Sequence, residues 1–247
     1  MKIIAYTALL YGTDYLGWAI RSVIDHVDEY HVIYDATGHG SHGHVTDRTC
    51  PDTREQLFAI AQGAAGDKLR WHDAGPFAHE GYQREAIHMF APDADVILVL
   101  DADEIWPEAD WRAIFSNDDA VRLRRIRMPI IHFWRSFHRA VLHDPAFPER
   151  FIIPGAPEGS WTMHGTPICH MGYAQRIEIV EFKQHTHGHK GEWRRDCDWF
   201  NDKFMANAQE DCHPVGSEYW WPEQVNPLDY MPSWMSEHPY FGREVIE

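Results

Sequence analysis

The sequence is short of cysteine and of positive charge. Its four cysteines, Cys50, Cys169, Cys197 and Cys212, form no CxxC pair. This spacing argues against a disulfide framework or a zinc knuckle and favours free, buried thiols. Lys and Arg together number 22 against 38 Asp and Glu, which gives a formal net charge of −16. That balance argues against a protein that coats nucleic acid by charge alone, because such binding needs clustered basic residues.

Long hydrophobic runs are also missing. No segment approaches the roughly 18 consecutive apolar residues that a membrane-spanning helix needs. The first residues, MKIIAYTALLYGTDYLG, contain one Lys and a short apolar run, without a convincing signal-peptide cleavage site. We therefore expect a soluble, cytoplasmic protein with no membrane span. With 44% hydrophobic and 13% aromatic residues, residues 1–247 are expected to form one domain with a large core.

The first half of the chain alternates between strand and helix patterns. Residues 2–9 and 30–34 are short apolar runs, and the apolar positions of residues 16–27 between them fall on one helical face. This is a βαβ pattern, which implies parallel strands joined by a right-handed crossover. A third strand is expected at 69–72 and a further helix at 78–90.

Residues 96–100, VILVL, are continuous in Val, Ile and Leu. Such a run is typical of a central parallel strand that is covered by helices on both faces. In residues 121–127, by contrast, arginines alternate with apolar residues, which predicts a half-exposed strand, antiparallel or near an edge. Helices are expected around 175–187 and 193–208.

The predicted fold class is therefore α/β, with a mostly parallel central sheet flanked by helices. Residues 1–110 form its regular half, and residues 111–247 form a mixed C-terminal half that covers the domain.

Three carboxylates follow the predicted central strand in the segment ADVILVLDADEIW: Asp101, Asp103 and Glu104. In open α/β sheets, ligands bind at the carboxyl ends of the strands. Two carboxylates with one residue between them, on a chain leaving a strand, can converge on a hard divalent cation, whose shell a nucleotide diphosphate would complete. An isolated Asp-x-Asp is more often a solvated turn or a helix start. Its position after a central strand favours the site for a metal and a diphosphate.

Three segments carry a resemblance to a known family: KIIAYTALLYGTDYLGWAIRSVIDHVDEYHVIYD, HEGYQREAIHMFAPDADVILVLDADEIW and ICHMGYA. They resemble the GT-A glycosyltransferases, especially the small family 2-like enzymes. The resemblance covers residues 1–110 well and the remainder loosely. It implies a GT-A, Rossmann-like fold and the transfer of a sugar from a nucleotide-diphosphate sugar, with a UDP-sugar as the first choice, assisted by Mn²⁺ or Mg²⁺.

The resemblance also implies roles for particular residues. The residues expected to bind the nucleotide-sugar and its cation are Thr7, Leu9, Asp35, Arg84, Asp101, Ala102 and Asp103. Thr7 and Leu9 would line the nucleotide pocket, and Asp35 would hydrogen-bond the base or the ribose. Arg84 would lie near the diphosphate or the donor sugar. The simpler alternatives are that Asp35 caps a turn and that Arg84 is a solvated helix residue paired with Glu80.

The metal ligands implied by the resemblance are Asp101, Asp103 and His170. Asp101 would contact either the ribose or the metal, and Asp103 would ligate the metal directly. His170, in CHMGYA, resembles the downstream histidine that completes the metal shell in many enzymes of this fold.

The chain has 18 histidines, and two groups of them are closely spaced. One group is His39, His42 and His44, and the other is His185, His187 and His189. Imidazole clusters can hold zinc or another transition metal. Loop histidines without carboxylate or Cys partners at a defined spacing are more often exposed and unligated, so a dedicated zinc site is the less favoured interpretation.

An inverting transfer needs a general base that takes the proton of the acceptor hydroxyl. Glu158, in PGAPEGSW, and Asp144, in LHDPAF, are the candidate catalytic residues on the acceptor side. Neither aligns with a clear family motif, so inversion and retention both stay open.

The acceptor is also open: a saccharide, a lipid head group, a small molecule or a modified DNA base, with the basic stretch 122–139 as a candidate phosphate-facing surface. Three alternatives to glycosyl transfer remain. They are a nucleotidyltransferase of similar fold, a His-rich metal-dependent hydrolase and a non-catalytic nucleotide-sugar binder.

Overall fold

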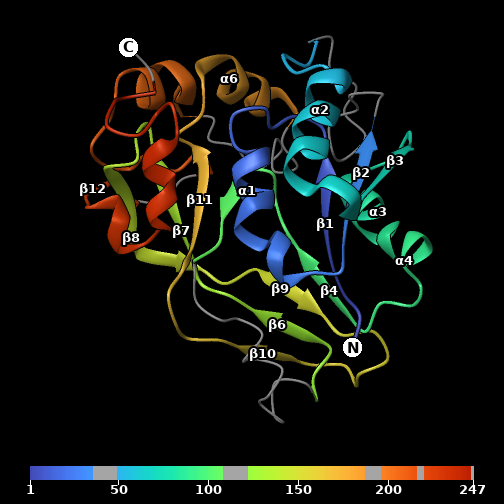
Figure 1. Ribbon diagram of the computed structural model, residues 1–247. Helices are drawn as coiled ribbons and strands as arrows, with labels where there is room; N and C mark the ends of the chain where they lie inside the picture. The colour runs from blue at the N-terminus through green and yellow to red at the C-terminus, as the bar shows by residue number, and fades with distance from the viewer. Residues whose placement is uncertain (36–48, 108–121, 187–195, 216–219, 246–247) are drawn as a thin grey trace.

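The computed structural model describes residues 1–35, 49–107, 122–186, 196–215 and 220–245. Two sheets organise these residues (Figure 1). The strands of the larger, seven-stranded sheet are β1 (Ile3–Leu9), β2 (Glu29–Asp35), β3 (Leu69–Ala74), β4 (Val96–Val99), β6 (Arg125–Arg127), β9 (Glu149–Ile152) and β10 (Ser160–Thr162). Their spatial order is β10-β6-β9-β4-β1-β2-β3.

Strand β4 stands in the middle of this order, as its apolar sequence predicts, and all four of its residues are buried. It pairs with β1 in parallel, and β1, β2 and β3 continue the parallel arrangement. Beyond β4 the sheet changes direction, because β9 is antiparallel to both β4 and β6. The alternating residues around Ile126 form the half-exposed strand β6, which is antiparallel to β9 as expected. The larger sheet is therefore mixed but mostly parallel.

Helices cover both faces of the parallel part. On one face lie α1 (Leu16–Val23) and α2 (Arg54–Ala65), whose buried side chains share a core with β1, β2 and β4. On the other lie α3 (Glu80–Glu85) and α4 (Ile87–Phe90). The predicted helix at 78–90 is thus two short helices that meet at Ala86. Every residue of β4 is sealed from water on both sides, which explains its unbroken run of apolar residues.

The second sheet has five strands in the order β12-β8-β7-β11-β5. These are β5 (Glu104–Ile105), β7 (Ile130–Trp134), β8 (Arg139–Ala146), β11 (Ile168–Tyr173) and β12 (Glu223–Gln224). Strand β5 begins only three residues after Asp101 and pairs antiparallel with β11, so that Glu104 lies opposite His170. The acidic segment after β4 therefore carries the chain from the first sheet into the second.

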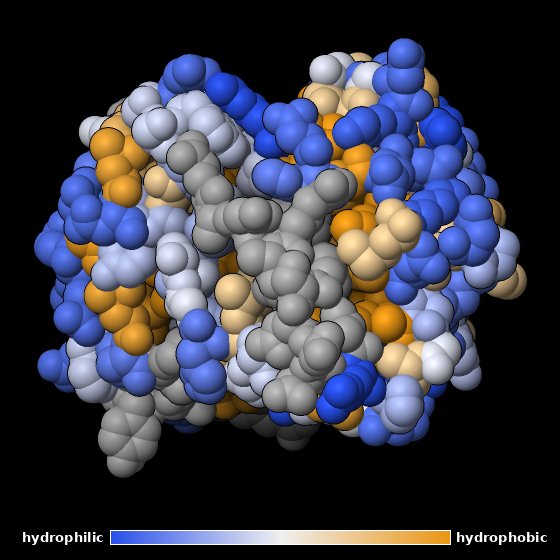
Figure 2. Space-filling model, turned by 60° about the horizontal axis from the view of Figure 1, so that its bottom comes forward, coloured by the Kyte–Doolittle hydropathy of each residue, from blue (hydrophilic) through white to orange (hydrophobic). Residues whose placement is uncertain are grey.

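Helix α6 (Ile177–Thr186) confirms the helix expected at 175–187, and the π-helix η5 (Trp199–Met205) occupies part of the segment 193–208. Short 3₁₀ helices are η1 (Ile24–His26), η2 (Gly66–Lys68), η6 (Pro227–Asp229) and η7 (Ser233–Glu237). None of the four cysteines forms a disulfide bond, and Cys169 and Cys212 are buried. Figure 2 shows one face of the molecule, where hydrophilic side chains predominate and hydrophobic patches are interspersed. In the parts of the chain described, no helix combines the length and the apolarity needed to cross a membrane.

Candidate functional site

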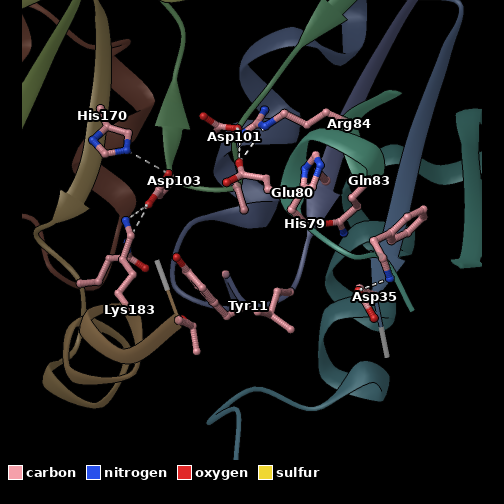
Figure 3. Close-up of a pocket in the computed structure, with 17 residues that line it drawn as sticks. Tyr11, Asp35, His79, Glu80, Gln83, Arg84, Asp101, Asp103, His170 and Lys183 are labelled. Carbon is pink, nitrogen blue, oxygen red and sulfur yellow. Dashed lines mark hydrogen bonds and ion pairs between the residues drawn. The ribbon is translucent and has the colours of Figure 1, made fainter. Parts of the chain in front are cut away.

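A cavity of about 160 Å³ opens at the carboxyl ends of β1, β2 and β4. A single water needs roughly 10–15 Å³ of such volume, so the cavity has room for a polar ligand or a group of waters. The residues lining it are Ala8, Leu10, Tyr11, Gly12, Asp35, Phe77, His79, Glu80, Gln83, Arg84, Asp101, Ala102, Asp103, His170, Gln175, Lys183 and Thr186. The acidic segment lies between α3 on one side and β11 with α6 on the other (Figure 3).

Six of the residues expected at a binding site line this cavity: Asp35, Arg84, Asp101, Ala102, Asp103 and His170. They come from β2, α3, the segment after β4, and β11, which are far apart in the sequence. Parallel strands end at the same edge of a sheet, and this places the side chains that follow them close together.

Thr7 and Leu9 do not line the cavity, contrary to expectation. The hydroxyl of Thr7 lies 2.5 Å from that of Tyr30 and donates a hydrogen bond to the carbonyl oxygen of Leu100, at 2.7 Å. Leu9 is fully buried in the core beside α1 and α2. Because successive side chains of a strand point to opposite faces, it is Ala8 and Leu10 that face the cavity.

Asp35, the last residue of β2, is 4% exposed. One of its carboxylate oxygens accepts a hydrogen bond from the backbone N–H of Phe77, at 3.3 Å. It has both of the features considered for it: it stabilises the turn after β3, and it also lies in the wall of the cavity.

Asp101 is held between two arginines. Its Oδ1 accepts a hydrogen bond from Nη2 of Arg84 at 2.7 Å, and its Oδ2 accepts one from Nη2 of Arg150 at 3.0 Å. Arg84 also pairs with Glu80 one helical turn away. Arg84 therefore has the expected ion pair with Glu80 and also lines the cavity. Burial raises the pKa of Asp101, but the two arginines outweigh burial and leave that pKa well below its usual range.

Arg150 also binds Glu104, whose side chain is fully buried. The guanidinium makes two hydrogen bonds to Oε1 of Glu104, one of them from Nε at 3.0 Å. Burial raises the pKa of Glu104 to about 7. Arg150 opposes this rise, and the nearby negative charge of Asp101 adds to it. Arg150 therefore neutralises two carboxylates of the acidic segment at once.

Asp103 has different partners, all from the second half of the chain. Its Oδ2 accepts hydrogen bonds from Nζ of Lys183 at 3.0 Å and from Nε2 of Gln175 at 2.8 Å. Its Oδ1 lies 3.4 Å from Nε2 of His170. Burial raises the pKa of Asp103, and Lys183 with His170 more than offsets this effect, so the pKa is lowered.

His170 connects Asp103 to a second histidine. Its Nδ1 lies 2.9 Å from Nδ1 of His132 on the neighbouring strand β7. Burial lowers the pKa of His170 in spite of the nearby Asp103, and burial together with His170 lowers that of His132 strongly. A neutral His170 can present a lone pair on Nε2 while Nδ1–H donates to His132, which is the arrangement of a metal-binding histidine oriented by a neighbour.

Two glycines allow the walls of the cavity to approach one another. Gly12 has a φ of +147°, and a Cβ there would lie 2.7 Å from the Cβ of Ala102. Gly172 follows His170 by two residues, and a Cβ there would collide with the ring of His170 and lie 2.8 Å from Nζ of Lys183. A side chain at either position would displace the residues that contact Asp103 or the acidic segment itself.

Of the three metal ligands predicted from the sequence, two are positioned so that they could bind the same ion. Asp103 Oδ1 and His170 Nε2, 3.4 Å apart, are spaced like neighbouring ligands of one ion, which at bond lengths of about 2.1 Å lie roughly 3 Å apart. Asp101 does not fit, because each of its oxygens is paired with an arginine. The described residues contain no group of three or more His, Cys, Asp and Glu side chains arranged to hold a metal ion. The remaining ligands would have to come from the bound molecule or from water.

Glu158, one of the two candidate general bases, does not line the cavity. Glu158 is exposed and pairs with Arg124 at 2.5 Å in the segment before β10, and it is absent from the cavity lining. Asp144 lies in β8, but its side chain falls outside the described residues. A position after the acidic motif in the sequence is thus insufficient to bring Glu158 near it.

Most of the closely spaced histidines also fall outside the described residues. This applies to His39, His42, His44, His187 and His189. His185 belongs to α6.

Sequence reasoning missed Lys183, Gln175 and Arg150. They contact the acidic segment across 80, 72 and 49 residues of sequence, respectively. The available signal was a lysine inside a helix whose neighbouring positions Ile179, Val180 and Phe182 are apolar and buried. A buried lysine needs a carboxylate partner, but the pattern does not say which one.

Comparison with known protein families finds no family model that matches the chain, and comparison with curated proteins finds no significant match.

Proposed function

We propose that the protein transfers a sugar from a nucleotide-diphosphate sugar to an acceptor hydroxyl. The observation that carries this proposal is the segment Asp101–Asp103, which leaves the central strand β4 at its carboxyl end and lines a cavity together with Asp35 and Arg84. This is the place where open α/β sheets bind nucleotides. The GT-A resemblance of residues 1–110 predicts the same function.

In this proposal Asp35 recognises the nucleoside. Its buried carboxylate lies at the end of β2, and carboxylate oxygens accept hydrogen bonds from the N–H or hydroxyl groups of a base and a ribose. Arg84 supplies a guanidinium for the diphosphate, since planar guanidinium groups bind phosphate oxygens in pairs. The pairing with Asp101 and Glu80 keeps Arg84 oriented.

Asp103 and His170 are the residues that would hold Mn²⁺ or Mg²⁺. When bound, such an ion neutralises negative charge that develops on the departing diphosphate. The balance of charges at the cavity is a reason to expect such an ion. Arg84, Arg150 and Lys183 face Asp101, Asp103, Glu104 and Glu80, which leaves no surplus of positive charge for a diphosphate.

The basic stretch 122–139 offers little support for a nucleic-acid acceptor. Arg124 and Arg125 pair with Glu158 and Glu149, respectively. Arg135 and Arg139 are buried. These arginines do not form one phosphate-facing surface, so a saccharide or small-molecule hydroxyl is the preferred acceptor.

The test is a panel of UDP-, GDP-, ADP- and CDP-sugars with Mn²⁺ or Mg²⁺, followed by thermal shift and by release of the nucleotide. We expect one donor class to stabilise the protein only when the metal is present. Asp103→Asn should abolish this stabilisation. Asp93→Asn, which changes an exposed carboxylate paired with Lys2, should preserve it and serves as the matched control.

Donor stabilisation that survives Asp103→Asn would contradict the proposal. Stabilisation without release of the nucleotide in the presence of varied acceptors would identify a non-catalytic binder. Release of phosphate without a sugar donor would favour the hydrolase alternative.

A further inference from the structure

Lys183 is a buried lysine whose charge is directed at Asp103. It reaches from α6 into the cavity, and its Nζ lies 3.0 Å from Oδ2 of Asp103 and 3.4 Å from the carbonyl oxygen of Gly172. Its side chain is only 10% exposed. In the described part of the chain, Asp103 is the one carboxylate within ion-pair distance of it. A buried ammonium is costly without such a partner.

Gln175, which contacts Asp103, has a side-chain oxygen that could accept a further hydrogen bond. The residue is fully buried, and its Nε2 donates to the same Asp103 oxygen that Lys183 contacts. Its Oε1 is buried and has no hydrogen-bond partner among the described residues. A native structure rarely leaves such an atom unpaired unless a ligand or a water completes it. An amide oxygen beside a carboxylate is suited to a cation or to a hydrogen-bond donor.

The ammonium of Lys183 and a divalent cation would both interact with the carboxylate of Asp103. The cation's fitting ligands are Asp103 Oδ1 and His170 Nε2, and Lys183 sits on the other oxygen of Asp103. Two positive charges a few ångström apart in a buried site repel each other strongly, because the surroundings screen them far less than water does. Asp103 can neutralise one of them well, and it cannot fully neutralise both.

We propose that Lys183 is a built-in counter-cation of Asp103 that competes with the divalent ion, an inference that rests on the proposed function of the site. Without a bound ion, Lys183 stabilises the buried carboxylate. When the ion binds, the ammonium loses this partner and becomes available to the incoming diphosphate. The rings of Tyr11 and Tyr173, with centroids 6.0 and 5.8 Å from Nζ, offer cation–π contacts that keep the ammonium at the cavity.

The test is a titration of the full chain with Mn²⁺ alone, followed by the electron paramagnetic resonance signal of the free ion. Lys183→Met should bind Mn²⁺ at least about tenfold more tightly than the wild type, because a competing charge is removed. Lys183→Arg keeps the charge and should stay within about threefold of the wild type. Lys203→Met is the matched control, since Lys203 forms a separate ion pair with Asp211, and should leave the affinity unchanged.

A second measurement guards against misfolding. Lys183→Met leaves Asp103 buried without its lysine, so the variant should melt at a lower temperature without metal and gain more from Mn²⁺ than the wild type does. The double variant Lys183→Met/Asp103→Asn should bind Mn²⁺ weakly, and its melting temperature should no longer rise when Mn²⁺ is added. A purely structural role for Lys183 predicts the opposite, that its loss weakens Mn²⁺ binding.

Equal or weaker binding of Mn²⁺ by Lys183→Met overturns the inference, as does the absence of Mn²⁺ binding in both proteins. If the expected gain appears but no nucleotide-sugar is used, the proposed function fails and the competition stands. If a donor binds in the Asp103-dependent way but Lys183→Met shows no gain, the competition fails and the proposed function stands.

Discussion

The two aspartates of the acidic segment lie two residues apart and are neutralised in different ways. Asp101 is gripped by Arg84 and Arg150, one on each oxygen. Asp103 depends on a single lysine, helped by a neutral amide and by a histidine whose pKa is lowered. Two arginines with further carboxylate partners form a fixed network, whereas one ammonium on a flexible side chain forms an exchangeable pair.

From this difference in their partners we infer separate roles for Asp101 and Asp103. Loss of one arginine still leaves Asp101 with the other, and both are tied to additional acidic residues, so Asp101 is built to hold the segment in place. Asp103 keeps one oxygen directed at His170 at a distance typical of shared metal ligands. We therefore expect the Asp101 side to govern stability and the Asp103 side to govern ligand binding.

The largest effect is expected for Arg150→Met, on the Asp101 side. The substitution leaves Glu104, which is fully buried, without its counter-charge, and breaking a buried ion pair costs about 3–5 kcal/mol. Denaturation by urea would measure it. Arg124→Met removes the exposed pair with Glu158 and should cost less than about 1 kcal/mol.

Adding Glu104→Gln to Arg150→Met should restore much of the lost stability, because the uncompensated charge is then gone. A single substitution that costs no more than Arg124→Met would show that the Asp101 network is not the rigid part of the site.

A smaller effect is expected from adding a methyl group at the two glycines. Gly12→Ala forces a Cβ against Ala102 at a φ of +147°, where neither the backbone nor a short side chain can yield. It should destabilise the fold by about 2–4 kcal/mol. Gly172→Ala meets the movable end of Lys183 and the ring of His170, and about 1–2 kcal/mol is expected. Thermal or urea unfolding would rank the two variants. A larger loss of stability for Gly172→Ala than for Gly12→Ala would contradict the view that the Asp103 side is the more adjustable one.

The smallest effect concerns a histidine pair outside the acidic segment, on the neighbouring strands β2 and β3, which we expect to make stability depend on pH. Nδ1 of His31 lies 3.1 Å from Nε2 of His72. Burial lowers the pKa of both below 6.5. As the pH falls below about 6.5, the unfolded chain takes up these protons before the folded one. Stability is therefore complete above that pH and declines below it.

The decline should be at most about 1.4 kcal/mol per pH unit for each histidine, and less for the partly exposed His72. Unfolding free energies of the wild type and of His72→Gln between about pH 8 and pH 5 would measure it. The variant should show the shallower decline. Parallel curves would place the acid sensitivity elsewhere.

Much of the larger sheet follows from local patterns. The run at 96–100 predicted a central strand, and β4 is the middle strand of seven. The alternation around Ile126 predicted a half-exposed strand, antiparallel or near an edge. β6 is half-exposed, lies next to the edge strand β10, and is antiparallel to β9 but parallel to β10. Local pattern did less well for Thr7 and Leu9, because residues next to one another in a strand point to opposite faces, and the sequence alone did not tell which face the cavity would use.

The sequence by itself determined that carboxylates follow a buried central strand, since an unbroken apolar run reveals burial on both faces and the next residues must then lie at the edge of the sheet. Which charges those carboxylates would meet was decided only by the tertiary structure. Arg150 reaches the segment from β9, Gln175 from the bend between β11 and α6, and Lys183 from α6, all dozens of residues away. Ion pairing depends on distance in space, and no periodicity in the chain records it.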